Sequence, residues 1–431
     1  MSGKTWIRNA AVLSAVALTL TACGRDGGSG GDDAGASDLT SISAGKATGD
    51  ITIWAMGTEG EKLPEIADAF NDANPDAEVT ITAVPWDDAP TKIATAITSG
   101  KTPDATLLNP SALASFVATG GFAAVPDGVA DATTFDAGSY ESTLIDGTSY
   151  SVPLYVDTRT LFFRKDLAEQ AGVEVPQAWA DYPAFAEALE GAGAEEGLLL
   201  PTGELGFTEQ VLIPFIWNAG GSITDAEQTK FTLDSDEAIE GLATYQSLFT
   251  SGAASDTGTY EPWGSVEERL ASGEIGSVVE GPWMVPTLKD ILGDEYASKI
   301  GVATIPSGSA NGQSWLDGGQ LAVFRDAKNP EGAWKFIKYL SEPAQAAQFS
   351  TATGDLPAVS AAWEPAGLTA DPTTAVFSEQ LKEAASAPAL PTWNQIASIM
   401  AGYGEKLARG TVTPEDAAEQ MQSELTSVGL D

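Results

Sequence analysis

Residues 51–108 read ITIWAMGTEGEKLPEIADAFNDANPDAEVTITAVPWDDAPTKIATAITSGKTPDATLL, and this stretch decides the fold class. Its apolar and β-branched segments predict three strands, at 50–56, 78–84 and 103–109. The first helix lies between the first two strands, because Leu63, Ile66, Ala67 and Phe70 recur at the spacing of one buried helical face. Residues 87–100 predict the second helix, and the order is therefore β-α-β-α-β.

This alternation predicts an α/β fold in which a parallel sheet is covered by helices. Ligands of such sheets bind beyond the carboxyl ends of the strands. In this chain those ends are followed by residues 56–59, 85–87 and 109–111. The glycines in GTEGEK lack the spacing of a phosphate loop, so we do not expect a nucleotide site there.

The N-terminus has the pattern of a secretion signal. Lys4 and Arg8 precede an apolar run over 10–20 that is too short to span a bilayer. Cys23 is the single cysteine of the 431 residues, and the sequence LTAC that ends with it resembles the lipobox of bacterial lipoproteins. The resemblance implies that residues 1–22 are removed and that Cys23 carries a lipid anchor at the extracytoplasmic face of the cell membrane. A free thiol behind an ordinary signal peptide is the alternative.

A segment rich in small and polar residues follows the cysteine. Residues 24–49 contain almost no large apolar side chain, so we expect residues 23–49 to form a lipid-anchored, flexible linker. The rest of the chain is long enough for two domains.

Composition limits the function. The chain has 61 acidic and 21 basic side chains and a net charge of −40, which argues against nucleic acid as a partner. It contains no histidine, which removes Ser-His-Asp catalysis and the usual zinc sites, and we expect no cofactor or metal. A pair of carboxylates could still hydrolyse a glycoside, so a secreted glycosidase stays an alternative.

Further motifs follow the first stretch in a characteristic order. They are YSVPLYVDTRTLFFRKDLAEQAGVEVPQAW (150–179), VVEGPWMVP (278–286), GVATIPSG (301–308), GGQLAVFRDAKNPEGAWKFIKYLSEPAQAAQF (318–349) and LPTWNQI (390–396). With residues 51–108, these motifs resemble the family 1 extracellular solute-binding proteins, the carbohydrate receptors of ABC importers that include maltose-binding protein.

The resemblance implies a two-lobed, periplasmic-binding-protein-like fold with interleaved chain crossings and a ligand cleft between the lobes. Residues 50–156 and 306–355 would form one lobe, and 157–305 and 356–431 the other. The implied protein is a monomer and not an enzyme. It would close around an oligosaccharide and deliver it to the permease subunits of an ABC transporter.

The resemblance also assigns polar contacts to the sugar. Thr58 and Glu59 follow the first strand, although either could instead cap the next helix. Asn109 and Ser111 follow the third strand, where an Asx or Ser turn is the alternative. Asp157 and Arg159 project to the same face of an extended segment and would bracket a diol, whereas the alternative is a structural ion pair.

Aromatic residues complete the implied site. Trp283 in EGPWMVP and Trp393 in LPTWNQI match tryptophans on which sugar rings stack. Weaker candidates are Trp86, Phe215, Trp217, and Trp315 with Asp317. For the aromatic candidates, an ordinary position in the core is the alternative.

One departure from maltose-binding protein concerns the solute. The first loop has an acid, Glu59, where that protein has a basic residue, which puts maltose itself in doubt. A peptide or a polyamine is the alternative solute for the same fold. A polyamine site would gather several carboxylates around aromatic faces in one cleft.

Overall fold

The computed structural model describes residues 39–255 and 265–430. The predicted signal peptide and Cys23 lie outside the described residues. No helix in the described ranges is long and apolar enough to cross a bilayer.

The β-α-β-α-β order predicted from residues 51–108 is confirmed. The elements are β1 (Gly49–Met56), α1 (Gly57–Ala73), β2 (Ala77–Val84), α2 (Ala89–Ser99) and β3 (Ala105–Leu108). β1 pairs in parallel with both β2 and β3. Leu63, Ile66, Ala67 and Phe70 are buried, as their helical spacing predicted. Gly60 lets α1 lie close to the sheet, because a Cβ there would overlap the carbonyl oxygen of Ala55.

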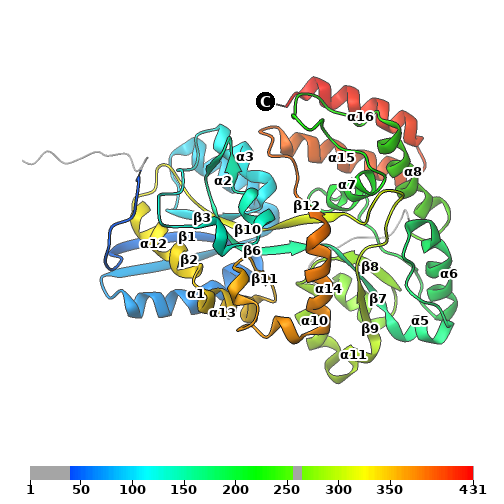
Figure 1. Ribbon diagram of the computed structural model, residues 1–431, viewed down its shortest axis with the longest axis horizontal. Helices are drawn as coiled ribbons and strands as arrows, with labels where there is room; N and C mark the ends of the chain where they lie inside the picture. The colour runs from blue at the N-terminus through cyan, green and yellow to red at the C-terminus, as the bar shows by residue number, and fades with distance from the viewer. Residues whose placement is uncertain (1–38, 256–264, 431) are drawn as a thin grey trace, which may run out of the picture. The chain divides into compact units, whose positions relative to one another are not determined.

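The large sheet has the strand order β11-β6-β10-β3-β1-β2, and β12 (Ala384–Ala385) pairs with β10. Its other strands are β6 (Val152–Thr158), β10 (Ser314–Val323) and β11 (Leu356–Pro357). Unlike the predicted parallel strands, β10 runs antiparallel to both β3 and β6. The sheet is therefore mixed, because a strand from late in the chain inserts between two early ones. Figure 1 shows α1 and α13 (Pro343–Thr353) on one side of β1–β3, and α2 and α3 (Pro110–Ala118) on the other.

A smaller antiparallel sheet has the order β8-β7-β9. Its strands are β7 (Thr160–Arg164), β8 (Ser277–Glu280) and β9 (Ile300–Ala303). β6 ends at Thr158 and β7 begins at Thr160, so the chain passes from one sheet to the other at Arg159.

The other elements surround the two sheets. The helices are α4 (Ala137–Glu141), α5 (Lys165–Ala171), α6 (Tyr182–Ala192), α7 (Thr208–Asn218), α8 (Asp236–Thr250), α9 (Ser265–Ser272), α10 (Met284–Leu292), α11 (Tyr296–Lys299), α12 (Pro330–Leu340), α14 (Pro372–Gln380), α15 (Trp393–Ala408) and α16 (Pro414–Val428). The 3-10 turns are η1 (Trp86–Asp88), η2 (Ala132–Thr134), η3 (Trp179–Asp181), η4 (Gly293–Glu295), η5 (Ser360–Ala362), η6 (Leu368–Ala370) and η7 (Leu381–Glu383). A small hairpin joins β4 (Leu144–Ile145) and β5 (Thr148–Ser149).

The described residues form two large hydrophobic cores and a smaller third cluster that takes residues from both sheets. The first core takes its residues from 47–155 and 321–362, and the second takes most of its residues from 161–254 and 390–425. Trp315 belongs to the second core, and Ala358 to the first. The chain thus leaves the first core, returns to it and leaves again, as interleaved crossings require. The lobe boundaries at 156, 305 and 355 stay predictions.

The last part of the predicted linker is packed on the first core. Ala47 is buried, and Leu39 and Ile42 pack against that core. Asn329 Nδ2 donates to the carbonyl of Thr48 at 2.8 Å. These apolar side chains are packed against the first core, so the prediction of a flexible segment is wrong for residues 39–48.

Candidate functional site

The passage from β6 to β7 carries a buried ion pair. Arg159 Nη1 donates to Asp157 Oδ1 at 2.5 Å, and both side chains are almost fully buried. Asp157 also faces Asp317 in the register of β6 with β10. The strand crossover therefore places one guanidinium between carboxylates in the interior.

Amide side chains connect this ion pair to both cores. Arg159 Nη2 donates to Gln210 Oε1 on α7, and Gln210 Nε2 donates to Asp317 Oδ2 at 3.1 Å. Asn109 Nδ2 donates to the same oxygen at 3.3 Å. We call Asn109, Asp157, Arg159, Gln210 and Asp317 the junction cluster. It joins the loop after β3 to the start of α7, elements that pack in different cores.

Asn109 reaches the junction cluster because it does not cap its own helix. It is the N-cap residue of α3, yet its side chain makes no capping hydrogen bond. The Asx turn considered as an alternative is therefore absent at this described residue, and the amide points to Asp317 instead. Ser111 lies half-buried in the first turn of α3.

The first turn of α1 also places a carboxyl group, that of Glu59, in the interior. α1 begins at Gly57 with Met56 as its N-cap residue, so the alternative that Thr58 or Glu59 caps this helix is wrong. Thr58 is exposed, whereas Glu59 is buried and bonded to Tyr155 and Trp86.

Asp355 lies near Glu59 and Tyr155. It is buried, and the pKa of Tyr155 is raised by burial and by the charges of Glu59 and Asp355. We call Glu59, Tyr155 and Asp355 the acidic end of the site.

Burial dominates the electrostatics of these carboxyl groups. It raises the pKa of Glu59, Glu209 and Asp317 to about 7 in each case. It also raises the pKa of Asp157, and it raises that of Asp355 well above the ordinary value. Near neutral pH, such groups can accept hydrogen bonds as carboxylates or donate them as acids.

Neighbouring charges modify this effect differently near the junction cluster and at the acidic end. Arg159 opposes the rise in the pKa of Asp157, Asp317 and Glu209. For Glu59 and Asp355, the neighbouring charges that act are other carboxylates, which raise the pKa further.

Trp283 lies beside the junction cluster. The Arg159 guanidinium carbon is 4.6 Å from the centre of the indole, a cation–π distance. Trp283 is half-buried in a turn just before α10, as its Gly-Pro-Trp sequence predicted. Gly281 accommodates the ring, because a Cβ there would overlap it.

Three other predicted aromatic residues form a buried stack in the second core. Trp217 and Trp315 are 5.7 Å apart and nearly parallel, and Trp315 is 5.9 Å from Trp393. We call these residues the tryptophan stack. Phe215 is also buried there, 4.7 Å from Trp179. These four rings have the surroundings of core residues.

The profile described as Bacterial extracellular solute-binding protein matches residues 55–347. The chain belongs to this family.

Relatives of this solute-binding protein cover most of its length. The diacetylchitobiose binding protein DasA of Streptomyces coelicolor is 23% identical over 442 residues, which cover 96% of each chain. The galactooligosaccharide-binding protein of Bacillus subtilis is 24% identical over 295 residues, which cover 65% of this chain and 66% of the relative.

Solved structures confirm the fold class. The GacH receptor of Streptomyces glaucescens, described without ligand and with acarbose, has a TM-score of 0.80 and 25% identity; the match covers 90% of this chain and 100% of that one. The sugar-binding protein MalE of Xanthomonas citri has a TM-score of 0.78 and 25% identity, with 88% and 97% covered. The predicted two-lobed, periplasmic-binding-protein-like fold is therefore confirmed.

Sequence reasoning missed four polar residues in or beside the site of this solute-binding protein. They are Tyr155, Glu209, Gln210 and Asp355. A signal was present for two of them, because Glu209 and Gln210 precede the apolar run VLIPFIW in a helix that is buried along its whole length.

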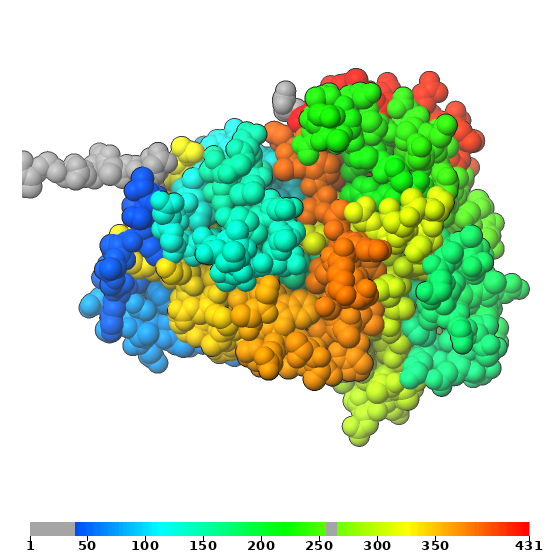
Figure 2. Space-filling model, in the orientation of Figure 1, coloured from blue at the N-terminus to red at the C-terminus, as the bar shows by residue number. Residues whose placement is uncertain are grey.

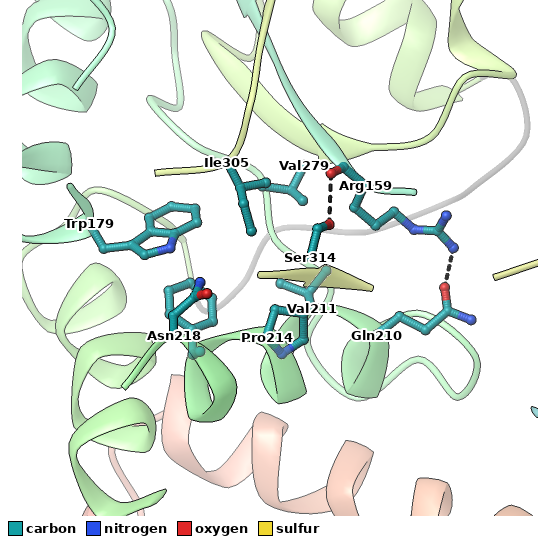
Figure 3. A pocket seen from close by; sticks show the side chains of 10 residues that line it. Arg159, Trp179, Gln210, Val211, Pro214, Asn218, Val279, Ile305 and Ser314 are labelled. Atoms are coloured by element: carbon teal, nitrogen blue, oxygen red, sulfur yellow. Dashed lines mark hydrogen bonds between the residues drawn. The ribbon is translucent and has the colours of Figure 1, made fainter. Parts of the chain in front are cut away.

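A small pocket lies behind Arg159 in the second core (Figure 3). Its lining is mainly apolar and includes Trp179, Phe215 and Asn218. The free volume is about 10 Å³, near the minimum for one water molecule, whereas ligand pockets measure roughly 300 Å³ or more. A sugar therefore enters this site only if the elements around Arg159 move apart.

A hydrogen bond at the surface also joins α3 to the segment before α15. Ser115 Oγ on α3 donates to the carbonyl of Pro391, just before α15, at 2.7 Å. In Figure 2 the orange atoms of the segment before α15 lie against cyan atoms of the region that includes α3.

Proposed function

We propose that this protein is a lipid-anchored receptor that binds a sugar, specifically an oligosaccharide, and delivers it to an ABC import permease. The observation that carries the proposal is the junction cluster. It combines two carboxyl groups, a guanidinium and two amides, which together can accept hydrogen bonds from the hydroxyl groups of one ligand and donate hydrogen bonds to them.

The charges of the cluster suit an uncharged polyol. Arg159 offsets the desolvation of Asp157, and a carboxylate and a guanidinium together can accept from and donate to the hydroxyl groups of a diol. Trp283 supplies an aromatic face at the edge of the same cluster. The relatives named for diacetylchitobiose and galactooligosaccharide, and the receptor described with acarbose, support a saccharide as the solute.

Binding requires opening and closing at the crossover between the sheets. The junction cluster takes residues from the loop after β3, from β6 and β10, and from α7. A sugar that bonds to all of these elements favours the closed arrangement, and the permease can then distinguish the loaded receptor from the empty one.

The proposal is tested by a thermal-shift screen followed by calorimetry. The panel holds diacetylchitobiose, galactooligosaccharides, maltodextrins, acarbose, short peptides and spermidine. We expect at least one saccharide to raise the unfolding midpoint, and Asp157→Asn to reduce that shift. A response confined to peptides or spermidine would contradict the proposal, and reducing sugar released from any oligosaccharide would favour the glycosidase alternative.

The lipid anchor has its own test. Cys23→Ala removes the thiol that would be acylated, so we expect the protein to leave the membrane fraction with unchanged affinity for its solute. Membrane fractions washed with carbonate are compared for both forms. If the variant stays bound, Cys23 is not the anchor.

A further inference from the structure

The two ends of the site differ in their charge balance. At the junction cluster, Arg159 is paired with Asp157 and opposes the rise in the pKa of Asp317. At the acidic end, Asp355 directly precedes β11, which pairs with Val156 and Tyr155 of β6, and Glu59 is hydrogen-bonded to Tyr155. The charges that act on these two carboxyl groups are those of other acids, whereas the carboxyl groups of the junction cluster have Arg159.

Hydrogen bonding at the acidic end is incomplete. Asp355 is 5% exposed, and its Oδ2 has no hydrogen-bond partner among the described residues. A buried oxygen without a donor is costly, so Oδ2 of Asp355 indicates a donor that a ligand would bring.

An organic cation fits the carboxyl groups of the acidic end better than a metal ion does. Within 39–255 and 265–430, no group of three or more acidic or other ligating side chains has the geometry to hold a metal. An ammonium group carries three N–H donors and one charge, and it also binds favourably at aromatic faces.

We propose that the solute is an amino sugar, whose protonated amine lies between Glu59 and Asp355 while its hydroxyl groups bond to the junction cluster. This inference rests on the proposed function and narrows its substrate class. Burial and the charge of Asp157 raise the pKa of Glu59, and an ammonium beside this carboxyl would favour its charged form.

Matched sugars test whether the positive charge of the amine strengthens binding. The disaccharide chitobiose, its N-acetylated form and cellobiose share one skeleton and carry amine, amide and hydroxyl groups respectively. A galacto-configured set and spermidine complete the panel. Calorimetry at about pH 6 keeps the amines protonated. We expect an amine-bearing sugar to bind at least about tenfold more tightly than its neutral partners.

Single substitutions test where the amine of the sugar binds. Glu59→Gln and Asp355→Asn each remove one charge from the acidic end, and we expect either to reduce the preference for the amine about tenfold or more. Glu379→Gln removes the same charge from the surface of α14 and should leave the preference unchanged, which controls for the net charge of −40.

The outcomes separate the two proposals. If a neutral sugar binds as tightly as its amine partner, the amino-sugar inference is overturned and the sugar receptor stands. If spermidine alone binds, both are overturned in favour of a polyamine receptor. If no amine-bearing sugar of either configuration binds, the inference is also overturned.

Discussion

The tryptophan stack and every residue of the junction cluster except Gln210 were predicted to touch the ligand, yet the two groups differ in what surrounds them. The tryptophan stack is buried in one core, where its rings contact each other. The junction cluster is polar, and it links elements of two cores; its residues are buried except Asn109, which is half-buried. An indole gains from burial anywhere, whereas a buried carboxylate is stable only with suitable partners. Burial of charge therefore locates the site better than the presence of tryptophan does.

Removing the central ring of the tryptophan stack should cost stability. We expect Trp315→Ala to lower the free energy of unfolding by about 3–5 kcal/mol, because Trp315 is 1% exposed and packs between two other indoles. Chemical denaturation measures this loss. A stable Trp315→Ala protein that no longer binds its solute would instead place the stack in the site.

Removing the cation of the junction cluster should cost about as much, but in a way that depends on pH. We expect Arg159→Met to lower the free energy of unfolding by about 3–5 kcal/mol at about pH 8, where buried carboxylates lose their partner. At about pH 5 the loss should shrink, because the raised pKa values let those groups become neutral. Arg409→Met breaks an exposed pair on α15 and should cost under about 1 kcal/mol. Equal losses at both pH values would contradict this account.

Glu209 should make stability depend on pH. Its pKa is raised from 4.5 to about 7, mainly by burial. Between these values the unfolded chain has lost the proton while the folded protein keeps it, so stability is highest at low pH and falls as pH rises to about 7. The fall amounts to about 3 kcal/mol for this group. Glu209→Gln should remove that part of the slope in denaturation measured across pH, whereas Glu295→Gln at the surface should not.

Trp283 should behave unlike the stack. We expect Trp283→Ala to weaken solute binding by about 2–4 kcal/mol, or roughly thirty- to a thousandfold, while the free energy of unfolding changes much less. The ring is half-buried and lies over Arg159 at the edge of the cluster. Calorimetry and denaturation of the same variant decide the matter, and unchanged affinity would remove Trp283 from the site.

Local patterns predicted the first part of the fold well. The strands and helices of residues 49–108 followed from periodicity, because each buries one face against its neighbour in sequence. The insertion of β10 between β3 and β6 could not be predicted this way, since it joins residues more than 150 positions apart.

The site was predictable only in part for the same reason. Asn109, Asp157 and Asp317 stood out through the family motifs, and Arg159 stood out through its spacing of two residues from Asp157. Asp355 was missed because nothing in its local sequence indicates that the fold brings it beside Glu59.

A structure of the protein with its bound saccharide tests the central claim most directly. We predict that the sugar contacts Asp157, Arg159 and Trp283, and that Trp217, Trp315 and Trp393 keep their contacts with one another. A sugar lying on the opened faces of Trp217, Trp315 or Trp393, away from Arg159, would contradict the account.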